Sequence, residues 1–345
     1  MHIESQNADI IYNIGGDYIN ESPEVALMLK AEKQKKLNEL HSVSYLESLK
    51  GEYSEKKIIH RKQEIQNIKD ELKGKAQLLI YGEPGLGKTA LLYQLSNELD
   101  NVIYLSVKDK SPLSVVSYLT NKIRQIKGDE LIEFHELHDA LNWLQTVIQN
   151  TNYYFVIDDS EQNEDIVNSL ISLDKYDATF IFASRNLSIF EKSSIKSYAC
   201  KPFSEAEMKE YLEISAIKLN LIEFNEIYIA SKGNPLYLFY FSNFQIHPFP
   251  DDLNVYQKAI WGKLNTIQQE ILIFVSIPYF NISLEEISAL IEIKSPLDLL
   301  DKTEKISSLL KNTNGNLEIF HPSFKEFILD YIKSKGLYKY YSERL

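Results

Sequence analysis

One eight-residue segment constrains the fold of this chain more than any other, Gly82-Glu83-Pro84-Gly85-Leu86-Gly87-Lys88-Thr89. It fits the pattern G-x-x-x-x-G-K-[ST] at every required position. It follows the apolar run 77–81, which predicts a buried strand, and it precedes a helical stretch over 90–99. Such a turn aims backbone N–H groups and a helix N-terminus at one place, which predicts a phosphate-binding loop. A glycine-rich surface turn is the alternative.

The segments after this loop alternate between two patterns. Apolar runs predict strands, and longer stretches with helical periodicity separate them. The strands are expected at 102–106, 153–157 and 179–183, and the helices at 112–127, 135–149 and 164–173. Buried strands between helices predict an α/β fold with a parallel sheet covered on both faces.

The rest of the chain divides by its pattern into further segments. Residues 1–50 predict an N-terminal hairpin and helix, and residues 51–200 the nucleotide-binding domain. Residues 201–252 predict a helical lid domain, and residues 253–345 place helices before a hairpin, which is the order of a winged helix. We therefore expect a P-loop NTPase core followed by an α-helical lid and a winged-helix domain.

Two neighbouring acidic residues complete the expected phosphate chemistry. Lys88 is expected to reach the β and γ phosphates, and the Thr89 hydroxyl to bind Mg²⁺. Asp158 and Asp159 follow the strand 153–157 directly. Asp158 is expected to hold Mg²⁺, directly or through water, and Asp159 to polarise an attacking water. A solvated acidic turn is the alternative.

Arginine is scarce, because the chain has only Arg61, Arg124, Arg185 and Arg344. Arg185 lies just after the strand 179–183, where its planar guanidinium suits a γ phosphate. We expect it to sense that phosphate, and an ordinary surface arginine is the alternative.

Composition excludes several classes of protein. A net charge of −12 argues against broad binding to nucleic acid or membrane surfaces. A single cysteine, Cys200, excludes a disulfide framework and a cysteine-rich metal site. The first ten residues lack the basic and apolar regions of a secretory signal, so we expect a cytoplasmic protein.

The phosphate loop, the strand ending in Asp158-Asp159 and the strand ending in Arg185 occur in an order that resembles one family. This is the signal transduction ATPases with numerous domains (STAND), the NB-ARC and NACHT relatives of AAA+ proteins. Four further segments resemble family motifs in the same order: 58–65, 200–204, 233–236 and 320–324. Two of them depart from the usual pattern, with His60 in place of glycine and Phe-His-Pro in place of Met-His-Asp.

The resemblance implies a set of nucleotide contacts and ATP or ADP with Mg²⁺ as cofactor. Pro235 is expected near the base and His321 at the β phosphate of ADP. A first-turn helix proline and a helix-capping histidine are the alternatives. The full expected binding set is Ile59, Arg61, Gly82, Glu83, Pro84, Gly85, Leu86, Gly87, Lys88, Thr89, Ala90, Pro235 and His321.

The resemblance also implies a switch. ADP would hold the domains closed, and a protein trigger and ATP would open them and lead to homo-oligomers. Hydrolysis would be slow and would serve as a reset. Family analogy gives signalling as the role, with prokaryotic antiviral defence as the expected setting. The trigger, the effector, the preferred nucleotide and the oligomer size do not follow from the sequence.

Two alternatives remain open. An AAA+ ATPase with a DNA-binding winged helix would serve replication, transposition or transcription, but residues 251–345 carry 11 Lys and Arg against 13 Asp and Glu. The expected recognition helix in that region holds Asp298, Asp301 and Glu304 and no arginine. A mechanical remodelling ATPase needs an arginine supplied across a subunit interface, and only Arg61 and Arg124 remain for it.

Residues 10–19 form two β-rich runs around Gly15-Gly16. This segment looks similar to the short amyloid signalling motifs, RHIM-like ones included, that recruit effectors. A small hairpin packed on the ATPase domain is the alternative. Residues 1–50 are too short for a nuclease, TIR or protease effector domain.

Overall fold

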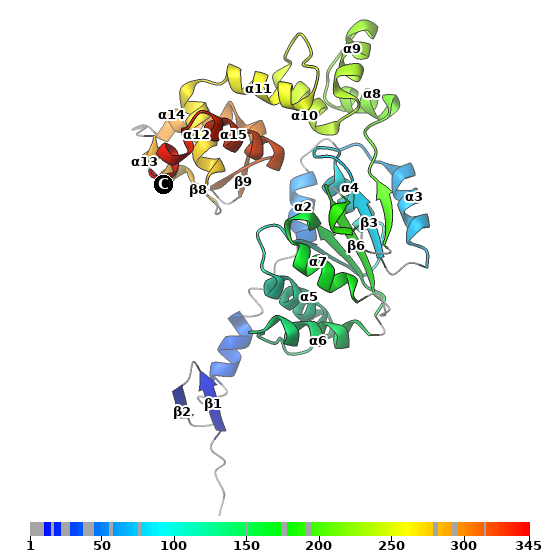
Figure 1. Cartoon of the computed structure of the whole chain (residues 1–345), viewed down its shortest axis with the longest axis vertical. Coiled ribbons are helices and arrows are strands. Elements are labelled where there is room, and N and C mark those ends of the chain that lie inside the picture. Colours follow the sequence, from blue (N-terminus) through cyan, green and yellow to red (C-terminus); the bar gives the residue numbers. More distant parts are fainter. Residues whose placement is uncertain are drawn as a thin grey trace, which may run out of the picture. The chain divides into compact units, whose positions relative to one another are not determined.

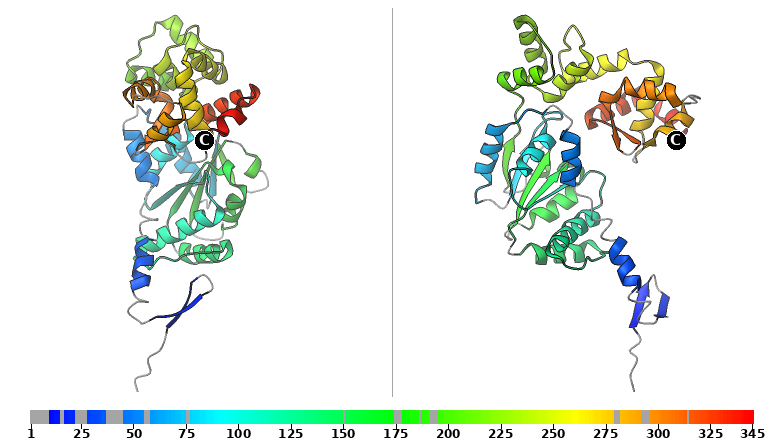
Figure 2. Two further views of the ribbon diagram at one scale, coloured as in Figure 1. Left: turned by 90° about the vertical axis from the view of Figure 1, so that its left-hand side faces the viewer. Right: turned by 180° about the vertical axis from the view of Figure 1, so that it is seen from behind.

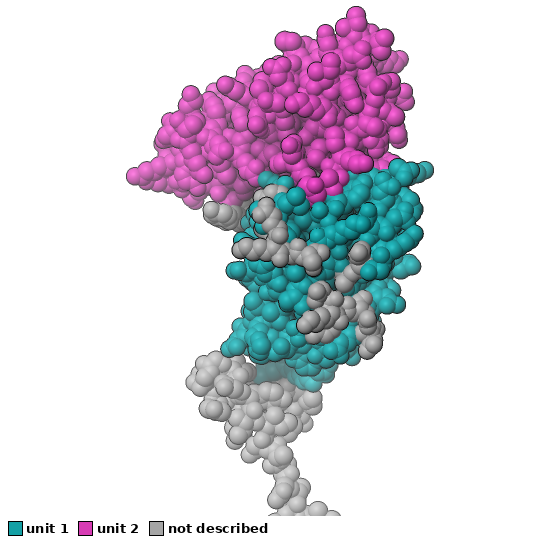
Figure 3. Space-filling view, turned by 45° about the vertical axis from the view of Figure 1, so that its right-hand side comes forward, with its two compact units in different colours: residues 1–55, 62–80, 92–198 teal, residues 56–61, 81–91, 199–345 magenta. Residues whose placement is uncertain are grey.

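The computed structural model describes residues 10–14, 17–21, 28–36, 45–54, 58–74, 77–149, 151–173, 178–185, 187–190, 195–278, 282–291, 296–313 and 315–345. The chain divides into two compact units (Figure 3). Unit 1 comprises 1–55, 62–80 and 92–198, and unit 2 comprises 56–61, 81–91 and 199–345. The phosphate-binding loop therefore groups with the C-terminal half of the chain. The predicted four-segment division remains a prediction.

A five-stranded sheet with the order β4-β5-β6-β3-β7 forms the centre of the α/β fold. Its strands are β3 (Gln77–Tyr81), β4 (Val102–Ser106), β5 (Tyr154–Asp158), β6 (Thr179–Ser184) and β7 (Lys196–Ala199). The pairs β4–β5 and β5–β6 are parallel. Phe155, Phe180 and Phe182 are buried and stack along this sheet. The four strands predicted from apolar runs are thus confirmed.

Helices surround this sheet (Figures 1 and 2). They are α2 (Tyr45–Ser54), α3 (Lys62–Leu72), α4 (Lys88–Ser96), α5 (Pro112–Lys127), α6 (Leu137–Ile148) and α7 (Glu164–Ile171). Helix α5 shows why the ends fall where they do: the Ser111 hydroxyl accepts from the Ser114 N–H, and Gly128 ends the helix at φ 77°. The predicted α/β core is confirmed.

Three helices make up the lid segment, residues 201–252. These are α8 (Glu205–Ile214), α9 (Leu221–Ser231) and α10 (Pro235–Phe244). Each starts with a side chain that caps its first N–H groups, from Ser204, Asn220 and Asn234 respectively. Ser204 and Glu207 form a capping box, in which each side chain bonds to the backbone N–H of the other residue.

The C-terminal region has the element order of a winged helix. Its elements are α11 (Leu253–Lys263), α12 (Thr266–Ser276), β8 (Ile282–Ser283), α13 (Leu284–Leu290), α14 (Pro296–Glu304), β9 (Leu310–Thr313), β10 (Asn316–Ile319), α15 (Pro322–Ser334) and α16 (Tyr338–Ser342). β10 pairs antiparallel with both β8 and β9. The predicted hairpin and closing helix are confirmed.

The N-terminal region contains β1 (Ile10–Ile14) and β2 (Asp17–Glu21), which pair antiparallel with Ile14 opposite Asp17. The predicted Gly15-Gly16 turn lies outside the described residues, as does the expected helix start at Ser22-Pro23. Residues 28–36 are helical. Within the described part of the chain, no helix combines the length and the apolar character needed to cross a bilayer.

Candidate nucleotide-binding site

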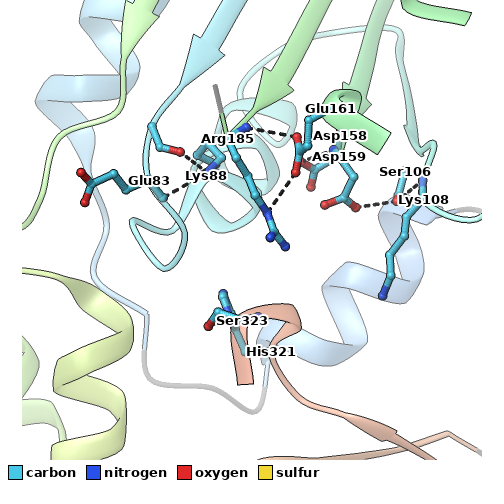
Figure 4. A network of polar contacts seen from close by, with 11 residues as sticks. Glu83, Lys88, Ser106, Lys108, Asp158, Asp159, Glu161, Arg185, His321 and Ser323 are labelled. Atoms are coloured by element: carbon cyan, nitrogen blue, oxygen red, sulfur yellow. Dashed lines mark hydrogen bonds and ion pairs between the residues drawn. The ribbon is translucent and has the colours of Figure 1, made fainter. Parts of the chain in front are cut away.

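The loop 82–89 connects β3 to α4. Gly85 and Gly87 adopt φ values of 82° and 80°, which glycine accepts without steric cost. The Lys88 ammonium donates to the carbonyl oxygens of Gly82 and Glu83, at 2.7 and 3.2 Å (Figure 4). Lys88 and Thr89 lie in the first turn of α4, and the N-terminus of a helix favours an anion through its N–H groups and its dipole. The loop has the chemistry of a phosphate site.

The lid segment bonds directly to the backbone of this loop, and both lie in unit 2. The Leu236 N–H donates to the Gly85 carbonyl at 3.2 Å. The Asn234 side-chain amide donates to the Pro84 carbonyl at 3.3 Å, while its Oδ1 accepts from the Leu236 and Tyr237 N–H groups. A Cβ on Gly85 would lie 2.7 Å from the Leu236 Cβ, so the contact requires glycine. The N-terminus of α10 is therefore tied to the loop.

Arg61 makes a second tie inside unit 2. Its side chain is 4% exposed, and it donates to the Leu86 carbonyl at 3.3 Å and to the Lys201 carbonyl at 2.5 Å. Its guanidinium also lies 5.6 Å from the centre of the Phe203 ring. Arg61 thus acts as a buried connector between the loop and residues 201–203, a placement that the sequence did not predict. Ile59, expected near the base, is buried in the core of unit 2.

Residues 200–203 and Gly233 complete this junction. The Cys200 N–H donates to the Tyr81 carbonyl at 2.8 Å, and the Phe203 N–H donates to the Gly233 carbonyl at 2.8 Å. Gly233 has φ 72°, and a Cβ there would lie 2.2 Å from the Phe203 carbonyl oxygen. Of the segments that the resemblance singles out, 58–65 bonds to the loop through the Arg61 side chain and 233–236 through Asn234 and Leu236. The segment 200–204 bonds to Tyr81, the residue just before the loop.

His321 caps α15 through its ring. Its Nδ1 accepts from the Ser323 N–H at 3.2 Å and lies 2.8 Å from the Ser323 hydroxyl. Because Nδ1 is the acceptor, a neutral ring carries its proton on Nε2. Pro235 likewise occupies the first turn of α10 after the Asn234 cap. Both residues have the structural roles that the sequence left as alternatives, and their nucleotide contacts remain predictions.

In unit 1, Asp158 ends β5 and is 3% exposed. The Tyr104 hydroxyl donates to its Oδ2 at 2.6 Å, and the Asp159 N–H donates to its Oδ1 at 2.9 Å. Burial, followed by the Asp158 charge, raises the pKa of Tyr104 well above its usual value. The tyrosine therefore stays protonated and donates to the carboxylate.

Asp159 takes the left-handed conformation, with φ 56°, at the end of β5. Its Oδ2 accepts from the Ser106 hydroxyl at 2.7 Å (Figure 4). Non-glycine residues in this conformation are uncommon and often lie at functional sites. The structure thus holds the residue expected to polarise water in one orientation.

Arg185 pairs with Glu161, a residue that sequence reasoning missed. The Arg185 Nε lies 3.0 Å from Glu161 Oε1, and its backbone N–H donates to Oε2 at 3.1 Å. The side chains are 18% and 12% exposed. The sequence signal was an acidic residue three positions after Asp158. It lies in the turn that follows β5, and β5 is the neighbour of β6, the strand that precedes Arg185. The expected contact of Arg185 with a γ phosphate remains a prediction.

The residues present suit Mg²⁺. Thr89 offers a hydroxyl and Asp158 a carboxylate, both hard oxygen donors. Among the described residues, no group of three or more His, Cys, Asp or Glu side chains could hold a metal. Magnesium commonly binds through one or two protein ligands, with water and substrate phosphates completing its shell, so each unit offers a donor of a kind that this ion takes.

No family model matches the chain, and no curated protein matches it. Among solved structures, a STAND protein with a tetratricopeptide repeat sensor from Pyrococcus horikoshii aligns with a TM-score of 0.56 and 19% identity. The match covers 79% of this chain and 42% of that one, so this chain spans less than half its length.

Two further matches have lower scores. The Walker-type ATPase of Pyrococcus abyssi has a TM-score of 0.43 at 14% identity and covers 79% of this chain and 96% of that one. The ORC1 protein of Aeropyrum pernix in complex with DNA has a TM-score of 0.41 at 12% identity and covers 79% and 93%. The match to the STAND protein shows the fold alone: over 79% of its length, this chain shares the fold of that ATPase.

Proposed function

We propose that this chain is a STAND-type signalling switch that binds ATP or ADP with Mg²⁺. In this proposal the loop 82–89 binds the phosphates, Thr89 and Asp158 hold the metal, and Asp159 orients the attacking water. Arg185 senses the γ phosphate, and hydrolysis is slow and resets the switch. The segments 58–61 and 233–236 bind the base, and His321 binds the β phosphate of ADP.

One observation carries the proposal: three consecutive carbonyls of the loop are bonded to residues outside it. Pro84 accepts from Asn234, Gly85 from Leu236, and Leu86 from Arg61. A loop that only held nucleotide for catalysis would not need such ties. Because peptide groups are rigid and planar, a phosphate that turns an N–H of this loop also turns the adjoining carbonyl. Nucleotide occupancy is thereby coupled to the lid segment, as a two-state switch requires.

A nucleotide-binding measurement tests the first requirement of the proposal. Titration with a fluorescent ADP analogue should show binding that strengthens with Mg²⁺. Lys88→Ala should weaken it by at least about tenfold, because a charged donor to phosphate is lost. Lys73→Ala is the matched control, since Lys73 is an exposed lysine paired with Asp70. No binding by the parental chain, or equal binding by Lys88→Ala, would contradict the proposed site.

The signalling context is part of the same proposal. A protein trigger and ATP release the closed form and produce homo-oligomers, which act on an effector, with prokaryotic antiviral defence as the setting. Mass measurement in solution with ADP, with ATP and for Lys88→Ala addresses assembly. A larger species with ATP that is absent with ADP and in Lys88→Ala is the expected result.

The surface of α14 supports a switch over a DNA-binding ATPase. Asp301 in this helix pairs with Lys302 and Lys305 at 3.8 and 2.8 Å, so both lysines face a carboxylate. Leu297 on the same helix is 76% exposed. An apolar and charge-neutralised helix is poorly suited to DNA phosphates. Tight, salt-sensitive DNA binding in a shift assay would reverse this preference.

A further inference from the structure

The end of β4 presents two hydroxyl groups to the acidic pair. Tyr104 and Ser106 are two residues apart, so their side chains lie on the same face of the strand. The register places Ser106 opposite Asp158. The Tyr104 hydroxyl bonds to Asp158 at 2.6 Å and the Ser106 hydroxyl to Asp159 at 2.7 Å. One strand thus supplies a separate donor to each of two consecutive carboxylates.

Backbone bonds fix the same contact. The Val107 N–H donates to the Asp158 carbonyl at 3.1 Å. The Lys108 N–H donates to the Ser106 Oγ at 3.3 Å, and the Ser106 hydroxyl in turn donates to Asp159 (Figure 4). Tyr104 is 4% exposed and packed within the sheet. Rotation of the buried Asp158 carboxylate would break bonds that water cannot readily replace. Rotation of the half-buried Asp159 carboxylate would break its bond to Ser106.

We propose that Tyr104 and Ser106 are positioning residues with separate tasks. Tyr104 orients Asp158 for the Mg²⁺ that accompanies the nucleotide, and Ser106 orients Asp159 toward the attacking water. This inference rests on the proposed nucleotide-binding function. The two tasks can be measured separately, because the Tyr104 hydroxyl should affect the Mg²⁺ dependence of nucleotide binding and the Ser106 hydroxyl the rate of ATP turnover.

Tyr104→Phe tests the first task. With the fluorescent ADP analogue, the MgCl₂ concentration for half-maximal strengthening of binding should rise about tenfold, while affinity in EDTA stays unchanged. Tyr237→Phe is the matched control, because its buried hydroxyl donates to the Pro250 carbonyl at the same 2.6 Å. An unchanged Mg²⁺ dependence in folded Tyr104→Phe would overturn the assignment, as would an equal loss of affinity in EDTA.

Ser106→Ala tests the second task. Its ATP turnover should fall about tenfold while nucleotide affinity and Mg²⁺ dependence remain those of the parental chain. Ser276→Ala is the control, since its buried hydroxyl donates to the Leu272 carbonyl in α12. Parental turnover in Ser106→Ala, or a loss of affinity without a loss of turnover, would overturn this half of the inference.

A double-mutant cycle separates this inference from the proposed function. If Tyr104 acts through Asp158, the unfolding free energies of Tyr104→Phe and Asp158→Asn should be non-additive even without nucleotide. The cycle also covers the case in which Tyr104→Phe is too unstable for titration. Additive unfolding free energies would show that Tyr104 does not act through Asp158. A parental chain that binds no nucleotide would instead refute the proposed function, and the coupling between the two residues could still be measured.

Discussion

At the residue scale, glycine decides whether the junction in unit 2 can form. Gly233 combines a left-handed φ of 72° with a site where a Cβ would lie 2.2 Å from the Phe203 carbonyl. Gly315 has a φ of 86° and nothing within 4 Å of such a Cβ. A side chain at either position would strain the backbone because φ is positive. Only at Gly233 would it also clash with a neighbouring residue.

We therefore expect Gly233→Ala to cost roughly 3 kcal/mol of unfolding free energy or more, since conformational strain and overpacking add. Gly315→Ala should cost about 1–2 kcal/mol from strain alone. Urea denaturation of both variants measures the difference. Equal losses would show that the contact between Gly233 and Phe203 relaxes freely.

Arg61 makes a second prediction at this scale. Its truncation to alanine removes a buried cation that lies 3.8 Å from Glu207 and takes the arginine donor away from the Leu86 and Lys201 carbonyls. We expect a loss of about 3 kcal/mol in unfolding free energy. Arg124→Ala is the control, because this more accessible arginine donates to the Glu130 carbonyl and should cost about 1 kcal/mol. Equal losses from the two would contradict the connector role.

Some of the site could be predicted from residues and some could not. The loop 82–89 and Asp158-Asp159 stood out because their residue types follow buried apolar runs. Tyr104 did not stand out, because the sequence pattern of a strand is the same whether its tyrosine only packs in the core or also donates a hydrogen bond. Arg61 was placed at the base by resemblance, but its partners are mainly backbone carbonyls, which carry no sequence signature. β7 was missed because Lys-Ser-Tyr-Ala contains no apolar run.

At the scale of elements, helix 28–36 attaches to the rest of unit 1 through polar contacts. The Gln34 side-chain amide donates to the Leu131 carbonyl at 2.7 Å and accepts from the Leu131 N–H at 3.0 Å. Lys30 and Lys33 pair with Glu130 and Glu133 at 3.0 and 2.5 Å. All residues of this helix except Gln34 are exposed.

Such an attachment should respond to salt and acid. Exposed ion pairs are weak and screened, so trypsin cleavage within residues 28–36 should speed up as salt rises from about 0.05 to 0.5 M. The hydrogen bond from Lys33 lowers the pKa of Glu133. Because the pKa of Glu133 is lower in the docked form, this carboxylate stabilises docking at any pH above its pKa in the undocked chain. The stabilisation is lost as the pH falls through the pKa of the docked form.

The matched variants separate the attachment from the helix itself. Gln34→Ala should cleave faster at every salt concentration, because both bonds to Leu131 are lost. Glu32→Gln should not, since Glu32 pairs with Lys36 in the same helix. Cleavage rates that ignore both salt and Gln34→Ala would contradict a polar attachment.

At the scale of the whole molecule, the distribution of arginines bears on the kind of ATPase. Arg61, Arg124, Arg185 and Arg344 all contact groups of their own chain, including the Leu290 carbonyl for Arg344. A motor that supplies an arginine across a subunit interface would first have to break such contacts. The engagement of all four agrees with the slow hydrolysis that we propose, and turnover well above about one per second would contradict that proposal.

Nucleotide on the loop 82–89 is, in our proposal, coupled to the lid segment. Hydrogen exchange with and without Mg²⁺–ADP tests it most directly, at the Phe203 and Leu236 N–H groups that bond to Gly233 and Gly85. We expect nucleotide to slow exchange at both positions in the parental chain and at neither in Lys88→Ala. Nucleotide that binds tightly and leaves exchange at Phe203 and Leu236 unchanged would contradict it.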